Sequence, residues 1–262
     1  MIENCVAPLF VPANRIELLA KAASSGADAI IVDLEDAVAP AAKSDARHAL
    51  SGSLPMDVIV RINDIRSPWF ADDAAALASP GIAGVMLPKT ETPDDIATLR
   101  AVLARPMPII ALVETPRGVA NLDEIAPAAA RLAFGTLDYG ADLGCGVDSE
   151  TLLFARSRFV LAARLAGKPA PIDGVTPDYR DITACETDTR HAAKLGFGGK
   201  LCIHPNQVHT VMRGFTPSQE ELRWAQRVLD TAEGAQGLDG MMVDAPVRVR
   251  AHRLLARISV TR

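Results

Sequence analysis

Two carboxylates stand where apolar runs of the sequence end. Glu114 closes IIALVE, the most apolar run in the chain, and Asp138 follows three residues after the glycine that ends RLAFG. A carboxylate at the end of a buried strand needs a positive partner, because an unpaired charge is unfavourable away from water. Two carboxylates with waters and substrate oxygens form a ligand set typical of Mg²⁺ enzymes. The structural alternatives are pairing of Glu114 with Arg117 or Lys89, and helix capping by Asp138.

Arg61 lies inside another apolar run, VIVRIND. A guanidinium there is unfavourable unless it binds an anion, and its planar fork suits the carboxylate of a substrate. A salt bridge to Asp33 or Glu35 is the alternative. The segment VDLEDAV places Asp33, Glu35 and Asp36 within four residues. We expect one of these to point into the same site, while the others hold arginines or the waters around a metal ion.

The elements that must position these residues are short apolar runs that recur along the chain. The eight runs are residues 7–11, 29–33, 57–62, 84–88, 108–113, 131–135, 170–174 and 199–204. They are almost continuously apolar, which is typical of strands covered on both faces, and Ala/Leu-rich segments with helical spacing separate them. The pattern predicts an α/β fold, a TIM (β/α)₈ barrel, in which polar residues that follow the strands meet at one rim.

The predicted barrel covers residues 1–215. Residues 216–262 are expected to form a C-terminal helical extension that packs on the barrel or on a neighbouring subunit. The glycine-rich segment at 234–240 predicts a linker followed by a detached tail, because three glycines in seven residues cannot continue a helix. An open doubly wound sheet is the alternative fold, but no GxGxxG motif follows the first run, where Pro12 stands instead.

Composition narrows the class of partner. The 262 residues are 49% hydrophobic and carry a formal net charge of -5, which disfavours binding to nucleic acid or to an anionic membrane. No apolar run approaches the roughly 18 residues of a membrane-spanning helix, and no signal peptide is recognisable. Four cysteines stand far apart without a CxxC pair, as in a reducing compartment. We expect a cytoplasmic protein with a small-molecule partner.

Eight segments, in order, resemble the citrate lyase beta-subunit-like and malyl-CoA lyase branch of the HpcH/HpaI aldolase superfamily. They are LFVPANRIELLAKA, IIVDLEDAVAP with Lys43 and Arg47 after it, VRIND, GVMLPKTE, LVETPRGV, RLAFGTLDYGADLG, GKLCIHPNQV and LDGMMVDAPV. The resemblance spans nearly the whole chain. It implies a Mg²⁺-dependent carbon-carbon lyase on a TIM barrel, a homotrimer or a multiple of one, that cleaves or forms a 3-hydroxyacyl-CoA thioester by Claisen-type chemistry. The thioester would be of the citryl-, malyl- or citramalyl-CoA type.

The resemblance also implies roles for single residues. Glu114 and Asp138 match the metal ligands, and Arg61 matches the arginine that holds the carboxylate of the 2-oxo or hydroxy acid. Glu35 and Asp36 match acidic residues around the waters of the metal. The positions expected to contact coenzyme A are Phe10, Arg15 and Lys21, with His204 and Pro205 lining the coenzyme A side or orienting their loop.

Asp244 matches an aspartate that enters the active site of the neighbouring subunit and exchanges a proton with the acetyl carbon. Its alternative is an N-cap for a helix that begins at residue 245.

Met241 stands where the family commonly has a lysine. That departure favours a second hypothesis, a non-catalytic coenzyme A-binding subunit of a larger complex. A third is an acyl-CoA thioesterase with the same site. Asp36 replaces the base histidine of aldolases that act on free 2-oxo acids, which disfavours that activity.

Overall fold

The computed structural model describes residues 2–52, 54–231, 236–238 and 240–258. The chain divides into two compact units, Met1–Met212 and Arg213–Arg262.

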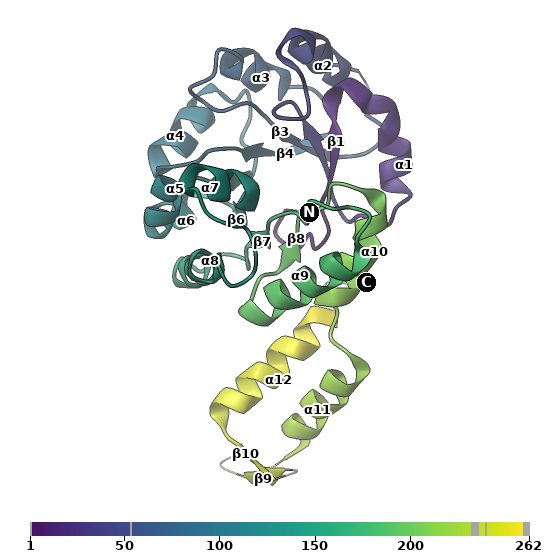
Figure 1. Cartoon of the computed structure of the whole chain (residues 1–262), viewed down its shortest axis with the longest axis vertical. Coiled ribbons are helices and arrows are strands. Elements are labelled where there is room, and N and C mark those ends of the chain that lie inside the picture. Colours follow the sequence, from purple (N-terminus) through teal and green to yellow (C-terminus); the bar gives the residue numbers. More distant parts are fainter. Residues whose placement is uncertain (1, 53, 232–235, 239, 259–262) are drawn as a thin grey trace. The chain divides into compact units, whose positions relative to one another are not determined.

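Eight parallel strands, hydrogen-bonded in sequential order, form the first unit (Figure 1). They are β1 (Leu9–Pro12), β2 (Ile30–Asp33), β3 (Val58–Arg61), β4 (Ile82–Leu87), β5 (Ile109–Val113), β6 (Arg131–Phe134), β7 (Ile172–Asp173) and β8 (Gly199–Lys200). The segment after β8 returns to β1, where the amide of Phe10 donates to the carbonyl of Cys202 and that of Cys202 to Pro8, both at 2.9 Å. The sheet is therefore closed, and the predicted TIM barrel is confirmed.

Every predicted apolar run overlaps one of these strands, but the last two strands are much shorter than their runs. β7 and β8 have two residues each. Gly174 follows β7 at a point where an added Cβ would collide with the side chain of Thr136. Main-chain hydrogen bonds continue beyond β8, since Leu201 donates to the carbonyl of Asp173.

Helices surround the sheet in the first unit (Figure 1). They are η1 (Ala13–Leu18), α1 (Leu19–Ala23), η2 (Pro40–Ala42), α2 (Lys43–Leu50), α3 (Phe70–Ala76), α4 (Pro93–Val102), α5 (Pro116–Ala120), α6 (Leu122–Ala128), α7 (Thr136–Leu143), α8 (Leu153–Leu165), α9 (Ile182–Leu195) and α10 (Pro205–Phe215). Local sequence fixes several of their starts. Thr92 caps α4 in a capping box with Asp95, and Thr115 caps α5, each followed by a proline at the first helical position.

The barrel interior explains why polar residues appear at strand ends. Side chains of a strand alternate between its two faces. Ile31, Ile59 and Leu112 belong to the apolar cluster that fills the barrel. Two residues further along the chain stand Asp33, Arg61 and Glu114, respectively. These three residues therefore continue the inward-facing rows at the carboxyl end of the barrel.

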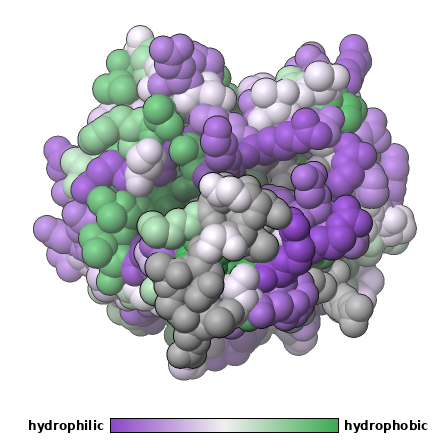
Figure 2. All heavy atoms as spheres, turned by 90° about the horizontal axis from the view of Figure 1, so that it is seen from below, coloured by the Kyte–Doolittle hydropathy of each residue, from purple (hydrophilic) through white to green (hydrophobic). Residues whose placement is uncertain are grey.

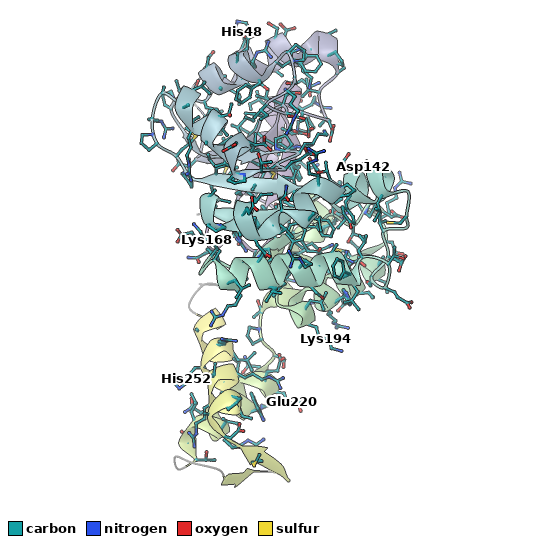
Figure 3. The ribbon with its side chains drawn as sticks, turned by 90° about the vertical axis from the view of Figure 1, so that its left-hand side faces the viewer. His48, Asp142, Lys168, Lys194, Glu220 and His252 are labelled. Carbon is teal, nitrogen blue, oxygen red and sulfur yellow. The ribbon has the colours of Figure 1, made fainter. Side chains whose placement is uncertain are left out.

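The outer surface of the barrel carries polar residues and several exposed apolar side chains. Polar residues such as His48 and Lys194 point outward from their helices (Figure 3). In contrast, α8 exposes Phe154, Leu161 and Leu165, of which Phe154 is 73% exposed. Apolar side chains also gather on one side of the face in Figure 2. Of the described helices, none combines the length and the apolar character that crossing a membrane requires.

The second unit is built from α11 (Gln219–Asp230), the antiparallel strands β9 (Gln236–Leu238) and β10 (Met241–Val243), and α12 (Ala245–Ile258). Ala225, Val228, Val243 and Ala251 form its buried core. The prediction of a linker with a detached tail is wrong for the described residues. Part of the glycine-rich segment pairs as a strand, and α12 packs on α11, because both helices bury apolar residues that need a common partner. Residues 234, 235 and 239 of that segment lie outside the described residues.

Candidate active site

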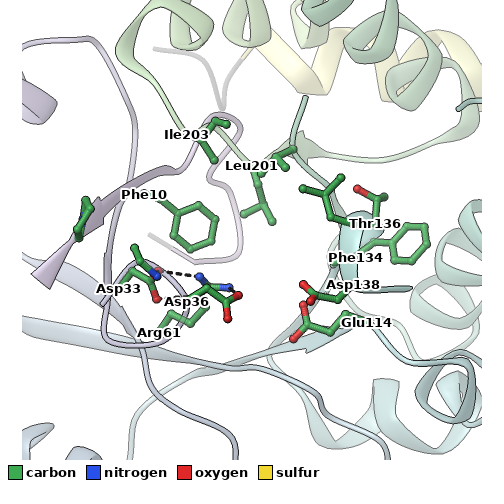
Figure 4. A pocket seen from close by; sticks show the side chains of 15 residues that line it. Phe10, Asp33, Asp36, Arg61, Glu114, Phe134, Thr136, Asp138, Leu201 and Ile203 are labelled. Atoms are coloured by element: carbon green, nitrogen blue, oxygen red, sulfur yellow. Dashed lines mark hydrogen bonds and ion pairs between the residues drawn. The ribbon is translucent and has the colours of Figure 1, made fainter. Parts of the chain in front are cut away.

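A cavity of about 370 Å³ opens among the carboxyl ends of the barrel strands. Arg61, Glu114 and Asp138, the residues predicted to bind substrate and metal, all line it (Figure 4). Phe10 and Asp36 line it as well. Residues that are more than 100 positions apart in the sequence thus meet at one place, as expected for the rim of a barrel.

Glu114 is a buried carboxylate, 2% exposed, at the end of β5. Its Oε1 accepts a hydrogen bond of 2.9 Å from the backbone amide of Lys89. Neither cation considered from the sequence forms an ion pair with it, since the ammonium of Lys89 pairs with Glu35 and Arg117 pairs with Glu91. Burial, together with the charges of Glu35 and Asp138, raises the pKa of Glu114 to about 8. A cation bound here would relieve this unfavourable charge.

Gly135 forms a cradle for Glu114. A Cβ at this position would collide with the Cβ and Oε2 atoms of Glu114, so only glycine permits this close approach of β6 to β5. The backbone itself does not require glycine, because its φ is -87°. Gly135 is also the N-cap of α7, and Asp138 lies in the first turn of that helix. The cradle therefore brings Asp138 to the same cavity as Glu114.

The residues present fit a magnesium ion. The charge of Asp138 raises the pKa of Glu114, which places the two carboxylates within electrostatic range of each other. No group of three or more His, Cys, Asp or Glu side chains suited to a metal ion occurs among the described residues. A metal at Glu114 and Asp138 would therefore complete its shell with water and substrate oxygens, as hard Mg²⁺ ions commonly do.

Arg61 is held by acidic partners. Its Nε and Nη2 atoms each donate a 2.7 Å hydrogen bond to the carboxylate of Asp33, its register partner on β2. Its Nη1 lies 2.9 Å from Glu35 Oε2 and 3.4 Å from Asp36 Oδ2. The salt bridges considered as an alternative from the sequence are thus present. The face of the guanidinium lies over the ring of Phe10, 4.9 Å from its centroid.

A buried lysine, Lys43, holds the loop after β2 in place through hydrogen bonds. The ammonium of Lys43 donates to the carbonyls of Leu34 and Glu35, at 2.8 and 3.0 Å, and to the amide oxygen of Asn63 at 2.7 Å. Glu35 is buried and accepts a hydrogen bond from Lys89. Burial is the main cause that raises the pKa of Glu35 to about 6, against the charge of Arg61.

From the sequence, Asp33 was named as an alternative partner of Arg61 and Lys89 as an alternative partner of Glu114, but neither was given a role in the predicted metal and substrate site. For Asp33 a signal was available. It stands two residues after an inward-facing isoleucine, as Arg61 does on the next strand. The position of Lys89 carried no such signal, because its contacts depend on the turn that ends β4.

Of the residues expected to contact coenzyme A, only Phe10 is among those that line the cavity. Phe10 lines the cavity, whereas Arg15 pairs with Glu17 on the surface and Lys21 is exposed on α1. The Nδ1 atom of His204 accepts from the amide of Asn206, and its ring stacks on Tyr179 with centroids 4.6 Å apart. Pro205 is the first residue of α10. The roles of these residues stay predictions.

Asp244 belongs to the second unit. Its Oδ1 accepts a hydrogen bond of 3.3 Å from the amide of Val247, three residues on, so Asp244 caps α12. This is the structural alternative considered from the sequence, and the catalytic role stays a prediction. The side chain of Met241, in β10, lies outside the described residues.

The chain is similar to known proteins over nearly all of its length. Residues 7–205 match the model of the family described as HpcH/HpaI aldolase/citrate lyase. The citrate lyase subunit beta-like protein of Deinococcus radiodurans is 37% identical over 272 residues, which cover 95% of this chain and 95% of that protein. The mitochondrial citramalyl-CoA lyase of Homo sapiens is 30% identical over 282 residues, which cover 94% of this chain and 83% of that protein.

A solved structure is similar over the whole chain. It is the crystal structure of protein CitE from Mycobacterium tuberculosis in complex with magnesium, acetoacetate and coenzyme A. Its TM-score is 0.88 at 37% sequence identity, and the match covers 99% of this chain and 100% of that chain.

Proposed function

The chain belongs to the HpcH/HpaI aldolase/citrate lyase family, and from that premise we propose that it cleaves or forms a 3-hydroxyacyl-CoA thioester. It is a lyase that depends on Mg²⁺ and acts on substrates linked to coenzyme A. The thioester is of the citryl-, malyl- or citramalyl-CoA type. One observation carries the proposal: Glu114, Asp138 and Arg61 line the same cavity.

Glu114 and Asp138 would hold the magnesium ion. When bound, Mg²⁺ supplies positive charge to substrate oxygens that become more negative in the reaction. The support is the buried carboxylate of Glu114, which accepts a hydrogen bond from a backbone amide but forms no ion pair within the described residues, so that burial raises its pKa. Because two carboxylates leave positions open, the substrate has room to enter the metal shell.

Arg61 would bind the carboxylate of the acid half of the substrate. Asp33 occupies the Nε and Nη2 atoms of the guanidinium and so fixes its plane. Of the groups near Nη1, Asp36 is the more readily displaced, because its contact is 3.4 Å long and its side chain is 58% exposed. A substrate carboxylate that replaces Asp36 would find the guanidinium already oriented.

Cleavage breaks the bond between the C2 and C3 atoms of the 3-hydroxyacyl chain. The hydroxyl proton passes to solvent water, a carbonyl forms at C3, and the electron pair of the broken C2–C3 bond passes to the thioester as an enolate. The enolate carbon then takes up a proton to give the shorter acyl-CoA. Asp244 of a second copy of the chain is the proposed donor. Arg61 keeps the departing 2-oxo acid in place, and condensation follows the same path in reverse.

Coenzyme A and a second copy complete the proposed site. Phe10 lies in the cavity, while Arg15 and Lys21 are exposed cations that suit the phosphates of coenzyme A. His204 and Pro205 are proposed to line the coenzyme A side. A homotrimer would bring the second unit of one copy to the barrel of another. The exposed apolar residues of α8 are of the kind that contacts between copies bury.

The direct test incubates the purified protein with citryl-, malyl- and citramalyl-CoA and identifies the products by mass spectrometry. We expect a 2-oxo acid and an acyl-CoA when Mg²⁺ is present, and their loss when EDTA is added. Free hydroxy acid and coenzyme A would indicate a thioesterase instead. Binding of coenzyme A without turnover of any of the three would indicate a non-catalytic subunit. Glu114→Gln serves as the matched inactive variant.

A further inference from the structure

Lys89 has an unusual backbone conformation at the end of β4. Its φ is +48°, and within the described residues it is the one non-glycine residue with a positive φ. Such a conformation is unfavourable for a residue with a Cβ and persists where the surrounding contacts require it. Glycine would adopt it at less cost. The contacts of Lys89 therefore call for an explanation.

Those contacts join two acidic residues of the site through different atoms. The backbone amide of Lys89 donates to Glu114 Oε1 at 2.9 Å, while its ammonium donates to Glu35 Oε1. Burial alone would lower the pKa of Lys89, but the hydrogen bond to Glu35 and the charges of Glu35 and Glu114 raise it above its ordinary value. The lysine therefore stays charged.

Glu35 is the third carboxylate near the proposed metal site. Its charge is the second-largest cause that raises the pKa of Glu114, after burial. Both of its oxygens face cations, because Oε2 lies 2.9 Å from Arg61 Nη1 and Oε1 accepts from Lys89. In the described part of the chain, Glu35 does not join Glu114 and Asp138 in a group of three metal-binding side chains.

A third protein carboxylate in the metal shell would be harmful to a lyase of this kind. It would increase the affinity for the free ion, since each added negative charge attracts a divalent cation. It would also occupy a position that substrate oxygens need, because catalytic metals keep an open position. A cation that holds Glu35 back would prevent both effects.

We propose that Lys89 is a positioning residue that keeps Glu35 out of the magnesium shell, while its backbone amide orients Glu114 toward the ion. This inference rests on the proposed function, because it presumes that Glu114 and Asp138 bind Mg²⁺. Lys89 thereby lowers the affinity of the site for free Mg²⁺ and raises its affinity for Mg²⁺ together with the substrate.

The test compares the affinity for Mg²⁺, measured by calorimetry without substrate, between the wild type and Lys89→Met. We expect the variant to bind Mg²⁺ at least about fivefold more tightly, because Glu35 becomes free to bind the ion. The KM for the thioester should rise about tenfold. With Mn²⁺ as the probe, water proton relaxation should report fewer exchangeable waters on the ion. A purely structural role would instead weaken both kinds of binding.

Three further variants keep the result interpretable. Lys89→Met combined with Glu35→Gln removes the added ligand and should return the affinity for Mg²⁺ to within about twofold of the wild type. Lys89→Arg keeps the charge and should preserve the wild-type KM. Lys194→Met, on the exposed surface of α9, is the control and should change neither quantity. Circular dichroism melting verifies that each variant is folded.

Two results would overturn the inference, and they differ from each other. If the wild type binds Mg²⁺ but Lys89→Met binds it equally or more weakly, or if the double variant stays as tight as Lys89→Met, the role of Lys89 is wrong while the metal site stands. If the wild type binds no Mg²⁺, the proposed function fails and the inference fails with it.

Discussion

Asp33 and Arg61 are register partners on β2 and β3, and two hydrogen bonds of 2.7 Å join their side chains. Both side chains are buried at the carboxyl end of the barrel. The aspartate fixes the plane of the guanidinium and also accepts from the backbone amides of Glu35 and Ala37, at 2.9 and 3.1 Å. One carboxylate therefore sets the position of both the arginine and the acidic loop beside it.

Replacement of Asp33 by alanine should destabilise the fold strongly. It leaves the guanidinium of Arg61 without its main partner in a buried place, which typically costs about 3–5 kcal/mol. Urea unfolding followed by circular dichroism measures this loss. Asp72→Ala is the matched control, because Asp72 pairs with Arg47 at the surface and its side chain is 70% exposed. We expect a change below about 1 kcal/mol there. If both substitutions lower the free energy of unfolding equally, the buried pair stabilises the fold no more than the surface pair does.

Arg61→Lys should retain the fold but lose most of the activity. Lysine keeps the positive charge and lacks the planar fork that contacts Asp33 and a carboxylate together. We expect kcat/KM for the thioester to fall by roughly 10- to 100-fold, as for the loss of a charged hydrogen bond in the transition state. Steady-state kinetics measure the change, and Arg158→Lys, outside the cavity, is the control. An unchanged kcat/KM would remove Arg61 from substrate binding.

Gly135→Ala should weaken magnesium binding and also destabilise the fold, because the added Cβ would collide with both the Cβ and the carboxylate of Glu114. The added methyl group would displace the carboxylate of Glu114, whereas the φ of -87° suits alanine. We expect the affinity for Mg²⁺ to fall by about tenfold or more, as measured by calorimetry. At Gly52 a Cβ would meet only the carbonyl of Ala49, 4.0 Å away, so Gly52→Ala serves as the control. Wild-type affinity in Gly135→Ala would mean that Glu114 is not held by this cradle.

Magnesium binding should depend on pH through Glu114. The pKa of this residue is raised from 4.5 to about 8 in the metal-free fold, so its contribution to stability is present below about pH 4.5 and is lost as the pH rises through 8. Mg²⁺ must displace the proton below pH 8, so its affinity should rise about tenfold per pH unit from pH 6 to 8. The thermal shift caused by Mg²⁺ should therefore be larger at pH 8.5 than at pH 6.

Glu114→Gln removes the titrating group and is the control for this dependence. Its response to Mg²⁺ should be small and nearly independent of pH. If the wild type shows the same affinity at pH 6 and pH 8.5, Glu114 does not exchange a proton for the metal ion.

Asp244→Asn separates catalysis from helix capping. Asparagine caps a helix about as well as aspartate does, so the melting temperature should stay within a degree or two of the wild type. Loss of the proton donor should lower kcat by about 100-fold or more. Mixed oligomers of Asp244→Asn and Glu114→Gln chains should regain activity, because some sites would then be intact. Full activity of Asp244→Asn would contradict the role of Asp244 as proton donor and leave it only the role of helix cap.

The barrel was predictable because its signal is local. Eight buried strands give eight apolar runs, and a run such as IIALV is apolar whatever its neighbours are. The second unit was less predictable, since the hairpin of β9 and β10 depends on the antiparallel pairing of Gln236 with Val243. A glycine-rich segment is compatible with both a linker and a hairpin.

The site was predictable in its chemistry and less so in its pairings. Glu114 and Arg61 were identified because a charged residue at the end of an apolar run needs a partner. Which partner each one has depends on the register between strands and on closure of the barrel. The pairing of Arg61 with Asp33 and the turn at Lys89 are consequences of that geometry, so the sequence alone left them open.

The central claim is that one magnesium ion, held by Glu114 and Asp138, and the guanidinium of Arg61 bind the same substrate. A crystal structure of the protein with Mg²⁺, coenzyme A and a small 2-oxo acid tests it most directly. The account predicts a single ion with both carboxylates as ligands, oxygens of the acid completing its shell, and the carboxylate of the acid on Arg61. An ion bound elsewhere, or an acid that contacts neither the ion nor Arg61, would contradict it.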